Sequence, residues 1–492
     1  MLLIFPPIAK ACEPPAGIAR LAGTLRANGV ACHLWDANLE GQLWLLEQPP
    51  VVDDTWTSRA WRSRQKHLQG LRSAATYYDN PSRYATAVND LNRLLQMAGQ
   101  PHQAELGLAD FRHDTLSPVR SQDLLQAALA PEAFPFFPFF QQRLPELMDG
   151  ITTVGISLTF LSQALCSFSL IGLIRQQYPD AKIVLGGGLV TSWLARPDWQ
   201  NPFGDLIDQL ISGPGEKPLL ELLGCNPPYK AAPPDYSQLP LSEYLSPGLI
   251  LPYSTASGCW WNRCSFCPER AEGNRYHSLP MPQVLDELQQ LGQQHQPRLL
   301  HLLDNALPPA LLQRLIEQPP GVPWYGFVRF EQQLEDPAFC RALRQSGCVM
   351  LKLGIESGDQ AVLDQLHKGI QVEMAGRILE NLHDAGIAVY GYLLFGTPAE
   401  DEAAARRTLA FTQQYHQALT FLNLAIFNMP LFGDEVPGYE TELFYEGDLS
   451  LYTGFKHPKG WGRGAVRRFL RQEFSKPPEI AARSEERRVG RV

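Results

Sequence analysis

A repeated alternation of strand and helix patterns in the second half of the chain constrains the fold most. Between residues 252 and 427 the sequence passes through six short apolar strand patterns, separated by longer stretches with apolar residues at helical spacing. Each repeat has the length that a βα unit needs. Six such units predict a partial (β/α)6 barrel, in which functional groups lie at the carboxyl ends of the strands. The expected strands are Tyr253–Ala256, Leu299–Leu303, Tyr325–Arg329, Val349–Ile355, Ala388–Phe395 and Phe421–Phe427. The expected helices are Met281–Gln294, Pro309–Glu317, Pro337–Gln345, Val372–Ala385 and Glu402–His416.

Three cysteines follow the first of these strands. Cys259, Cys264 and Cys267 are separated by four and two residues. Three thiolates in one loop can hold an iron-sulfur cluster and leave one iron open to another ligand. The alternatives are a chance clustering or a zinc site completed by a histidine. The nearest histidine is His277, and it lacks the second Cys-x-x-Cys pair that structural zinc sites favour.

Composition indicates a globular protein of two or three domains in a reducing compartment. The chain has 492 residues, 45% of them hydrophobic and 19% charged. Its nine cysteines are odd in number and mostly isolated, which favours the cytoplasm over a disulfide framework. The start of the chain lacks the features of a signal peptide, and no apolar run is long enough to span a membrane. A net charge of -9 disfavours a nucleic-acid partner. The basic residues between Arg463 and Arg491 suggest a contact with an acidic partner or, alternatively, a solvated helix face.

The first half of the chain predicts a Rossmann-like parallel sheet. Residues 2–38 read as strand, helix and strand, and the pattern resumes from residue 154 to residue 223. Residues 40–150 look like a helical insertion, and a proline-rich linker follows the sheet. The expected fold class is therefore α/β, with this sheet domain, a partial barrel and a small C-terminal extension. The expected domains are 1–225, a linker at 226–251, the barrel at 252–435 and the extension at 436–492.

With the cysteine loop placed after the first barrel strand, residues 1–430 resemble the radical S-adenosylmethionine superfamily. The resemblance is to the branch that carries an N-terminal cobalamin-binding-type domain. It implies that Cys259, Cys264 and Cys267 bind a 4Fe-4S cluster whose open iron binds S-adenosylmethionine. Reduction then cleaves this cofactor to a 5'-deoxyadenosyl radical, with a reductant such as flavodoxin or ferredoxin. The four-residue first spacing departs from the family's commonest spacing of three.

The resemblance also implies two contacts with the adenosyl part of the cofactor. Phe266 precedes the last cysteine and matches an aromatic position near the adenine; an ordinary loop-anchoring role is the alternative. Glu356 and Ser357 lie in Gly354-Ile355-Glu356-Ser357-Gly358 at the end of the fourth strand, and Lys368-Gly369 follow. This segment resembles the family's ribose contact. The alternative for Glu356 is a buried structural pair with Lys352.

Three further positions are carried over from the family. Asp304 ends the second strand, where the family receives the methionine amino group; here the usual glycines are absent, and capping of the helix after Pro308 is the alternative. Arg329 ends the third strand and would neutralise a carboxylate of cofactor or substrate, with a surface ion pair as the alternative. Gly396 belongs to a fifth-strand segment whose backbone supports the adenine. No catalytic residue is assigned.

The N-terminal domain resembles a cobalamin-binding module through its glycine turns. Gly155, Gly186-Gly187-Gly188 and Gly213 follow or end strand patterns, as suits a ligand across a sheet edge. The Asp-x-His-x-x-Gly element that supplies a cobalt ligand has no match, and His33 lies inside a strand pattern. The domain either binds cobalamin without a histidine or has lost it. The predicted function is a radical enzyme, as a cobalamin-dependent C-methyltransferase. The alternatives are a non-methylating enzyme that docks its substrate on this domain, or a non-catalytic metal-binding redox or partner-binding protein. The substrate, a small molecule or a peptide, is not readable.

Overall fold

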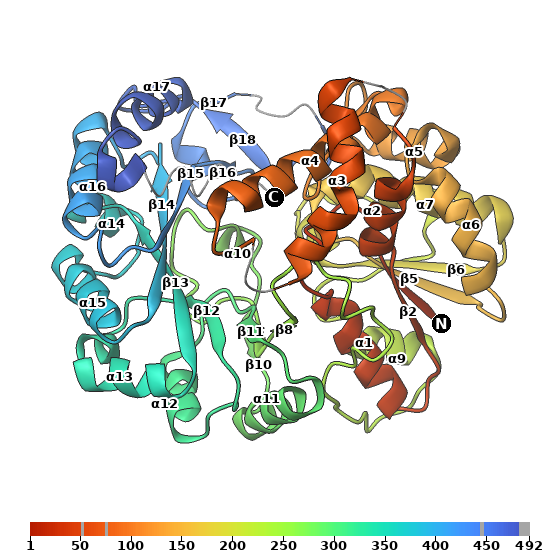
Figure 1. The fold of residues 1–492 in the computed structure, drawn as a ribbon, viewed down its shortest axis with the longest axis horizontal. Coiled ribbons are helices and arrows are strands. Elements are labelled where there is room, and N and C mark those ends of the chain that lie inside the picture. Colours follow the sequence, from red (N-terminus) through yellow and green to blue (C-terminus); the bar gives the residue numbers. More distant parts are fainter. Residues whose placement is uncertain (51–53, 74–76, 443–446, 482–492) are drawn as a thin grey trace. The chain divides into compact units, whose positions relative to one another are not determined.

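The computed structural model describes residues 1–50, 54–73, 77–442 and 447–481 (Figure 1). These residues form two compact units. The N-terminal unit contains residues 1–250 and 447–450, and the barrel unit contains residues 251–442 and 451–481. Within the described part of the chain, no helix combines the length and the apolar character that crossing a membrane requires.

The N-terminal unit is built on a five-stranded sheet in the order β2-β1-β5-β6-β7, and all its pairs are parallel. This confirms the α/β class and the parallel N-terminal sheet. The strands are β1 (Leu2–Phe5), β2 (His33–Asp36), β5 (Thr153–Ser157), β6 (Lys182–Gly186) and β7 (Gln209–Leu210). The helices that follow them are α1 (Ala16–Ala27), α7 (Leu161–Gln177), α8 (Gly188–Leu194) and α9 (Glu216–Leu222).

The segment inserted into this sheet is helical, as expected, but it also contains a hairpin that the sequence did not indicate. Its helices are α2 (Ala37–Glu47), α3 (Thr55–Arg72), α4 (Pro81–Gly99), α5 (Ser121–Leu129) and α6 (Phe137–Leu147). Its strands β3 (Ala104–Leu106) and β4 (Phe111–His113) pair antiparallel. Helix α7 is buried without a break from Gln163 to Ile174, because α5, α6 and β4 of the insertion pack against it.

The proline-rich segment after α9 packs onto the N-terminal unit. Tyr236 is fully buried, and the Tyr244 hydroxyl donates to the Asp36 carboxylate over 2.7 Å. Burial raises the pKa of Asp36 to about 6. Asp235 forms an ion pair with Arg26 of α1 at 2.5 Å. These contacts anchor the segment until strand β8 begins at Ile250.

The barrel unit contains a six-stranded sheet in the order β15-β14-β13-β12-β11-β8, and the strands from β11 to β15 pair in parallel. The strands are β8 (Ile250–Tyr253), β11 (Leu299–Leu302), β12 (Trp324–Val328), β13 (Cys348–Glu356), β14 (Ala388–Phe395) and β15 (Phe421–Ile426). The helices are α11 (Met281–His295), α12 (Pro309–Glu317), α13 (Pro337–Gln345), α14 (Gln360–Gln365), α15 (Val372–Asp384) and α16 (Glu402–Gln414). Figure 1 shows α12 to α16 along one side of the strands, as in the expected partial barrel.

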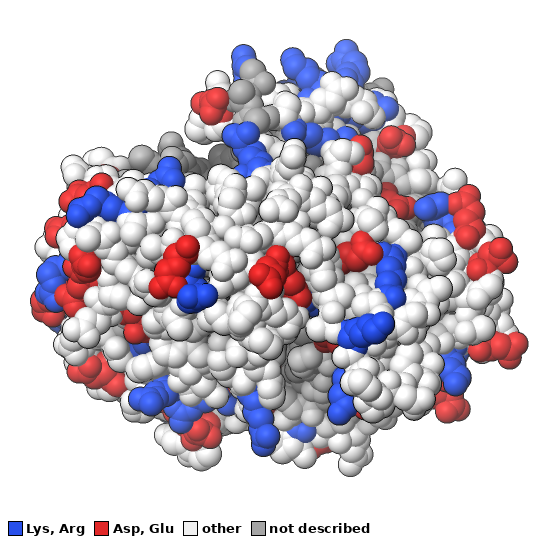
Figure 2. Space-filling view, turned by 90° about the horizontal axis from the view of Figure 1, so that it is seen from below, with Lys and Arg blue, Asp and Glu red and all other residues white. Residues whose placement is uncertain are grey.

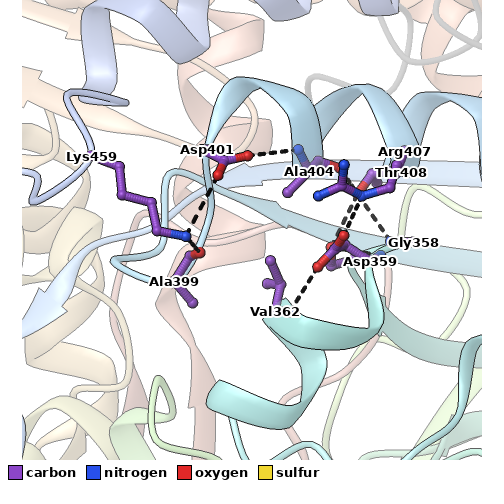
Figure 3. Close-up of polar contacts among 10 residues, drawn as sticks. Gly358, Asp359, Val362, Ala399, Asp401, Ala404, Arg407, Thr408 and Lys459 are labelled. Carbon is purple, nitrogen blue, oxygen red and sulfur yellow. Dashed lines mark hydrogen bonds and ion pairs between the residues drawn. The ribbon is translucent and has the colours of Figure 1, made fainter.

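Aspartates cap several helices of the barrel unit, and the C-terminal segment is tied to one of these aspartates (Figure 3). Asp401 accepts from the Ala404 N–H over 2.9 Å and so caps α16, while Asp359 caps α14 in the same way. The Lys459 ammonium donates to the Ala399 carbonyl and lies 3.6 Å from Asp401. Residues beyond β18 (Tyr452–Phe455) therefore pack on the carboxyl end of β14.

The surface carries charges of both signs. On the face drawn in Figure 2, uncharged residues cover most of the area, and Lys, Arg, Asp and Glu side chains are scattered among them. Such an interspersed pattern agrees with the overall charge of -9. It differs from the continuous positively charged surface that binds a nucleic acid.

Candidate functional site

The cysteine loop is closed at its base by a short pair of strands. β9 (Ala256–Ser257) pairs antiparallel with β10 (His277–Ser278), so the residues between them form one loop directly after β8. Gly258 begins this loop at a φ of +74°, and a Cβ there would lie 2.4 Å from the Arg275 carbonyl oxygen. Glycine is therefore required at the position before the first cysteine. Cys264 is buried, and Cys259 and Cys267 are partly buried.

Two cations lie next to the most buried thiol. The Arg329 Nη1 atom is 3.9 Å from the Cys264 sulfur. Burial raises the pKa of Cys264, while Lys368 and Arg329 oppose this rise because a nearby positive charge favours the thiolate. Burial also raises the pKa of Cys267, to about 11. The loop thus contains three thiols, and the positive charges of Lys368 and Arg329 stabilise negative charge at Cys264.

Two tryptophans fill the long interval between the first two cysteines. The Arg329 guanidinium lies 3.9 Å from the centre of the Trp261 ring, in cation-π contact. Gly369 packs against the other part of this ring, where a Cβ would come within 2.4 Å of Trp261 Cζ2. The sequence did not single out these residues. The signal that could have identified them is the pair of adjacent tryptophans between Cys259 and Cys264, an interval one residue longer than the family's commonest spacing.

The same loop holds buried polar atoms with no hydrogen-bond partner among the described residues. They are the indole nitrogens of Trp260 and Trp261 and the Ser265 hydroxyl oxygen. Buried donors are normally satisfied, so their concentration here indicates that an acceptor belongs in this place. Sulfides of an iron-sulfur cluster and the polar groups of S-adenosylmethionine are such acceptors. The residues present therefore fit the group that the sequence predicts.

Glu356 pairs with Lys368. The two charged atoms are 2.7 Å apart, and the side chains are 11% and 6% exposed. The expected alternative, a pair with Lys352, is wrong, because the Lys352 ammonium instead contacts His301 of β11 over 2.7 Å. Glu356 has a φ of +61°, and the register of β13 against β14 shifts beside it. A left-handed, non-glycine residue at a strand end is typical of functional sites.

Arg329 and Asp304 are both buried. Arg329 is 5% exposed, donates to the Lys368 carbonyl and forms an ion pair with Glu331 at 3.4 Å, so the expected ion pair exists but its arginine is buried. Both oxygens of Asp304 accept from Thr255, one from its N–H over 3.0 Å and one from its hydroxyl over 2.5 Å. Asp304 therefore ties β11 to the segment after β8. The helix after Pro308 has no side-chain cap.

Ser357, Phe266 and Gly396 lie around the same strand ends. The Ser357 hydroxyl is 3.1 Å from the Thr408 hydroxyl of α16 and accepts from the Asp359 N–H. Phe266 packs against a small apolar cluster of Val362, Leu366, Ala399 and Ala404. Gly396 has a φ of +77°, and its N–H donates to Glu400 over 2.5 Å. The structure thus brings Cys264, Phe266, Arg329, Glu356 and Lys368 into one contiguous region, whereas the side chains of Asp304 and Ser357 are engaged in packing.

Within the described ranges, no three His, Cys, Asp or Glu side chains lie close enough together to hold one ion. A 4Fe-4S cluster places a different demand on the protein, because each thiolate binds a different iron atom.

The barrel unit matches a known family. Residues 253–412 match the family model described as the radical SAM superfamily, where SAM is S-adenosylmethionine. This part of the chain is a radical SAM domain. A 4Fe-4S cluster and S-adenosylmethionine are the cofactors of this family, and the three cysteines of the expected cluster all fall within the match.

Curated relatives are similar to part of the chain. The anaerobic magnesium-protoporphyrin IX monomethyl ester cyclase of Rubrivivax gelatinosus is 23% identical over 272 residues, which cover 52% of this chain and 47% of the relative. The bacteriochlorophyllide d C-12(1)-methyltransferase of Chlorobaculum tepidum is 27% identical over 192 residues, covering 37% and 41%. The alignments therefore span less than half the length of these relatives.

Solved structures with the same fold include two cobalamin-dependent or cobalamin-containing radical SAM proteins. The enzyme OxsB with aqua-cobalamin bound gives a TM-score of 0.54 at 15% identity, covering 71% of this chain and 64% of OxsB. The methyltransferase TsrM from Kitasatospora setae, with tryptophan and a SAM analogue bound, gives 0.51 at 17% identity, covering 88% and 73%. At this identity the likeness establishes the fold of the radical SAM domain and the parallel sheet before it.

Proposed function

We propose that the chain is a radical SAM enzyme in which Cys259, Cys264 and Cys267 hold the 4Fe-4S cluster. The observation that carries this proposal is the set of unpartnered buried donors in the cysteine loop, next to Arg329 and Lys368. When bound, the cluster would supply the electron for reductive cleavage of S-adenosylmethionine, and the reaction would be hydrogen abstraction from the substrate by the resulting 5'-deoxyadenosyl radical. The single electron would come from a flavodoxin or ferredoxin. Nine free cysteines support a cytoplasmic location.

The chain's own residues would bind and orient these groups. Arg329 and Lys368 balance the negative charge of the thiolates, and Trp261 holds Arg329 in place. Glu356 would accept from ribose hydroxyls, with Lys368 fixing its carboxylate. Phe266 and the backbone at Gly396 would flank the adenine. Ser357 would support this part of the site through its hydrogen bond with Thr408. We assign Asp304 an indirect role, since it fixes the segment that leads into the cysteine loop.

The direct test is anaerobic reconstitution of the full-length protein. We expect about four irons and four sulfides per chain and deoxyadenosine formation that requires S-adenosylmethionine and a reductant. Cys264→Ala should abolish both, while Cys225→Ala, which removes a lone cysteine of the N-terminal unit, should change neither. Deoxyadenosine formation by the Cys264→Ala variant would refute the assignment.

Within this class, we propose that the N-terminal unit binds cobalamin and that the reaction is a C-methylation. Phe160 and Leu161 follow β5 at the carboxyl edge of the parallel sheet and are 51% and 36% exposed, a surface that suits a flat, largely apolar macrocycle. The loop is rigid, because the Gln163 side chain bonds the backbone on both sides, to Phe160 and to Pro6.

The histidines of this unit lie elsewhere. His33 begins β2 and so lies at the opposite, amino edge of the sheet, and His67 is buried against Asp90 in the insertion. His102 bonds the Ala133 carbonyl, and His113 accepts from the Thr115 and Leu116 N–H groups. The fit therefore supports cobalamin held without a protein imidazole.

Expression with cobalamin separates the candidate reactions. We expect about one cobalt per chain, and transfer of label from methyl-labelled S-adenosylmethionine to a carbon of the substrate. A chain that takes up no cobalt yet forms deoxyadenosine would instead be a non-methylating radical enzyme. The similarity to the Rubrivivax gelatinosus protein, a cyclase by name, is the observation that favours this second candidate.

A further inference from the structure

One face of the barrel-unit sheet is a continuous aromatic surface. On β12 and β14 the side chains alternate between fully buried and half-buried positions. The buried set, which includes Trp324 and Val389, faces the helices. The half-buried set on the opposite face contains Tyr325 and Phe327 on β12, Lys352 on β13, Tyr390 and Tyr392 on β14, and His301 on β11.

The rings of this face touch one another from strand to strand. Tyr392 contacts Phe327 and Tyr390, with ring centres 5.0 and 4.9 Å apart, and Tyr390 contacts Phe421 at 5.8 Å. Phe421 is 41% exposed, and among the described residues of the barrel unit it is the one large apolar side chain with that degree of exposure. A half-buried aromatic surface on the face of the sheet that does not pack against the helices suits a ligand contact.

A single cation lies in the middle of this surface. The Lys352 ammonium is 2.7 Å from His301 Nε2 and 4.9 Å from the centre of the Tyr325 ring. His301 stacks on Tyr325 with ring centres 4.3 Å apart and planes 7° from parallel. Two stacked rings therefore hold the ammonium at a fixed point, opposite Phe327 and Tyr390 in the register of the sheet.

This surface leads to the cysteine loop. Tyr325, Phe327 and Arg329 alternate along one strand direction and share one side of the sheet. Arg329 contacts the Cys264 sulfur. Along β13 the register shift beside Glu356 interrupts this alternation, so the side chains of β12 carry the connection. A molecule lying on the aromatic surface would thus reach the region assigned above to the cluster and S-adenosylmethionine.

We propose that this face binds the substrate, and that the substrate is a planar, conjugated acid whose carboxylate pairs with Lys352. The inference rests on the proposed function, because it assigns the substrate side of that same barrel. From β11 to β14 the face spans roughly 14 Å, so it has room for several fused or conjugated rings. Aromatic side chains stack on such a system, and one ammonium on a fixed site selects a carboxylate.

The test uses fluorescent probes and the reconstituted full-length protein. Pyrene-1-carboxylate is planar and anionic, pyrene-1-methanol is planar and uncharged, and decanoate is anionic and flexible. Fluorescence titration measures the two pyrenes directly, and decanoate is measured by competition. We expect pyrene-1-carboxylate to bind about tenfold more tightly than either of the others.

Variants locate the binding. Lys352→Met keeps the aliphatic stem and should abolish the preference for the carboxylate, Lys352→Arg should retain it, and Tyr392→Leu should weaken both pyrenes. Lys217→Met, on an exposed lysine of α9, is the matched control and should behave as wild type.

The comparison of the three probes on the wild-type protein needs no variant, so it decides even if a variant fails to fold. Equal binding of the two pyrenes, equal binding of decanoate, or a preference that survives in Lys352→Met would overturn the inference. Deoxyadenosine formation by the wild-type protein is measured separately and without a probe. Its absence would overturn the proposed function, whereas failed probe selectivity with deoxyadenosine formation intact would overturn the substrate class alone.

Discussion

Glu356 and Lys368 form a buried ion pair at the carboxyl end of β13, with Nζ and Oε1 2.7 Å apart, and Gly354 makes room for it. A Cβ at position 354 would lie 2.4 Å from this carboxylate oxygen and 2.6 Å from the ammonium nitrogen. Gly358 is explained by packing too, because a Cβ there would lie 2.6 Å from Phe411 Cβ in α16. The glycines around Glu356 thus serve the ion pair and the helix rather than direct ligand approach.

Removal of the ammonium should destabilise the barrel unit strongly. Lys368→Met leaves the Glu356 carboxylate buried and unpaired, which costs about 3–5 kcal/mol of the free energy of unfolding. The double variant Glu356→Gln, Lys368→Met should recover part of this loss. Urea denaturation measures both. Lys456→Met breaks an ion pair whose partners are each 74% exposed and should cost less than about 1 kcal/mol. Equal losses for the two lysine variants would contradict the structural role of the pair.

Gly369 should control iron retention through Trp261. Ala at position 369 would collide with the Trp261 ring at 2.4 Å and adopt a φ of +69°, so the cysteine loop must shift. Gly321→Ala is the matched control, because Gly321 has a φ of +79° with no atom within 4 Å of the added Cβ. Both variants should pay about 1–2 kcal/mol of backbone strain. Only Gly369→Ala should lose most of its iron after reconstitution, as measured by metal analysis. Full iron content in this variant would show that Trp261 does not position the loop.

The sequence predicted the strands and helices of the barrel because their patterns are local. The strand Ala388–Phe395 and the helices Pro309–Glu317 and Pro337–Gln345 coincide with the structure. The first strand was wrong by three residues at both ends: β8 runs from Ile250 to Tyr253 and includes Pro252. A proline normally argues against a strand, but β8 is an edge strand, where a missing N–H is tolerated.

The site was predictable where a residue's chemistry depends on its own loop, and less so where it depends on a distant one. The spacing of the cysteines pointed to a cluster. The partner of Glu356, in contrast, lies beyond α14, and the partner of Asp304 lies on a different strand end. Only the folded sheet brings these segments together, so a pattern along the chain cannot choose between Lys352 and Lys368. The roles of the three cysteines and of the cofactor contacts stay predictions.

Glu400 should make the stability of the barrel unit fall with rising pH. This carboxyl is fully buried and accepts from the Gly396 N–H and the Trp461 indole N–H, and burial raises its pKa from 4.5 to about 7. The folded state therefore binds the proton more tightly than the unfolded state. Stability is full below pH 4.5, declines between pH 4.5 and about 7, and is constant above that, with a total loss of about 3 kcal/mol.

The measurement for Glu400 is urea denaturation of wild type and Glu400→Gln at pH 5 and pH 7.5. The glutamine variant keeps both hydrogen bonds but does not titrate, so its stability should fall by about 2 kcal/mol less than that of the wild type between pH 5 and pH 7.5. Burial lowers the pKa of the neighbouring His457 from 6.5, so this histidine makes stability rise with pH in the same range, which opposes the effect of Glu400. His457 is present in both proteins, so its effect cancels in the difference between them. Parallel pH profiles for the two proteins would place the proton elsewhere.

Phe160 should be needed for cobalamin uptake but not for folding or for the cluster. Its ring is 51% exposed at the carboxyl edge of the N-terminal sheet, so Phe160→Glu should change the free energy of unfolding by less than about 0.5 kcal/mol. A charge on this edge opposes contact with an apolar macrocycle, and we expect cobalt content after expression with cobalamin to fall at least about tenfold while iron content is unchanged. Leu129→Glu is the control, since Leu129 is 80% exposed at the end of α5. Equal cobalt content in the two variants would move the cobalamin site away from the β5 loop.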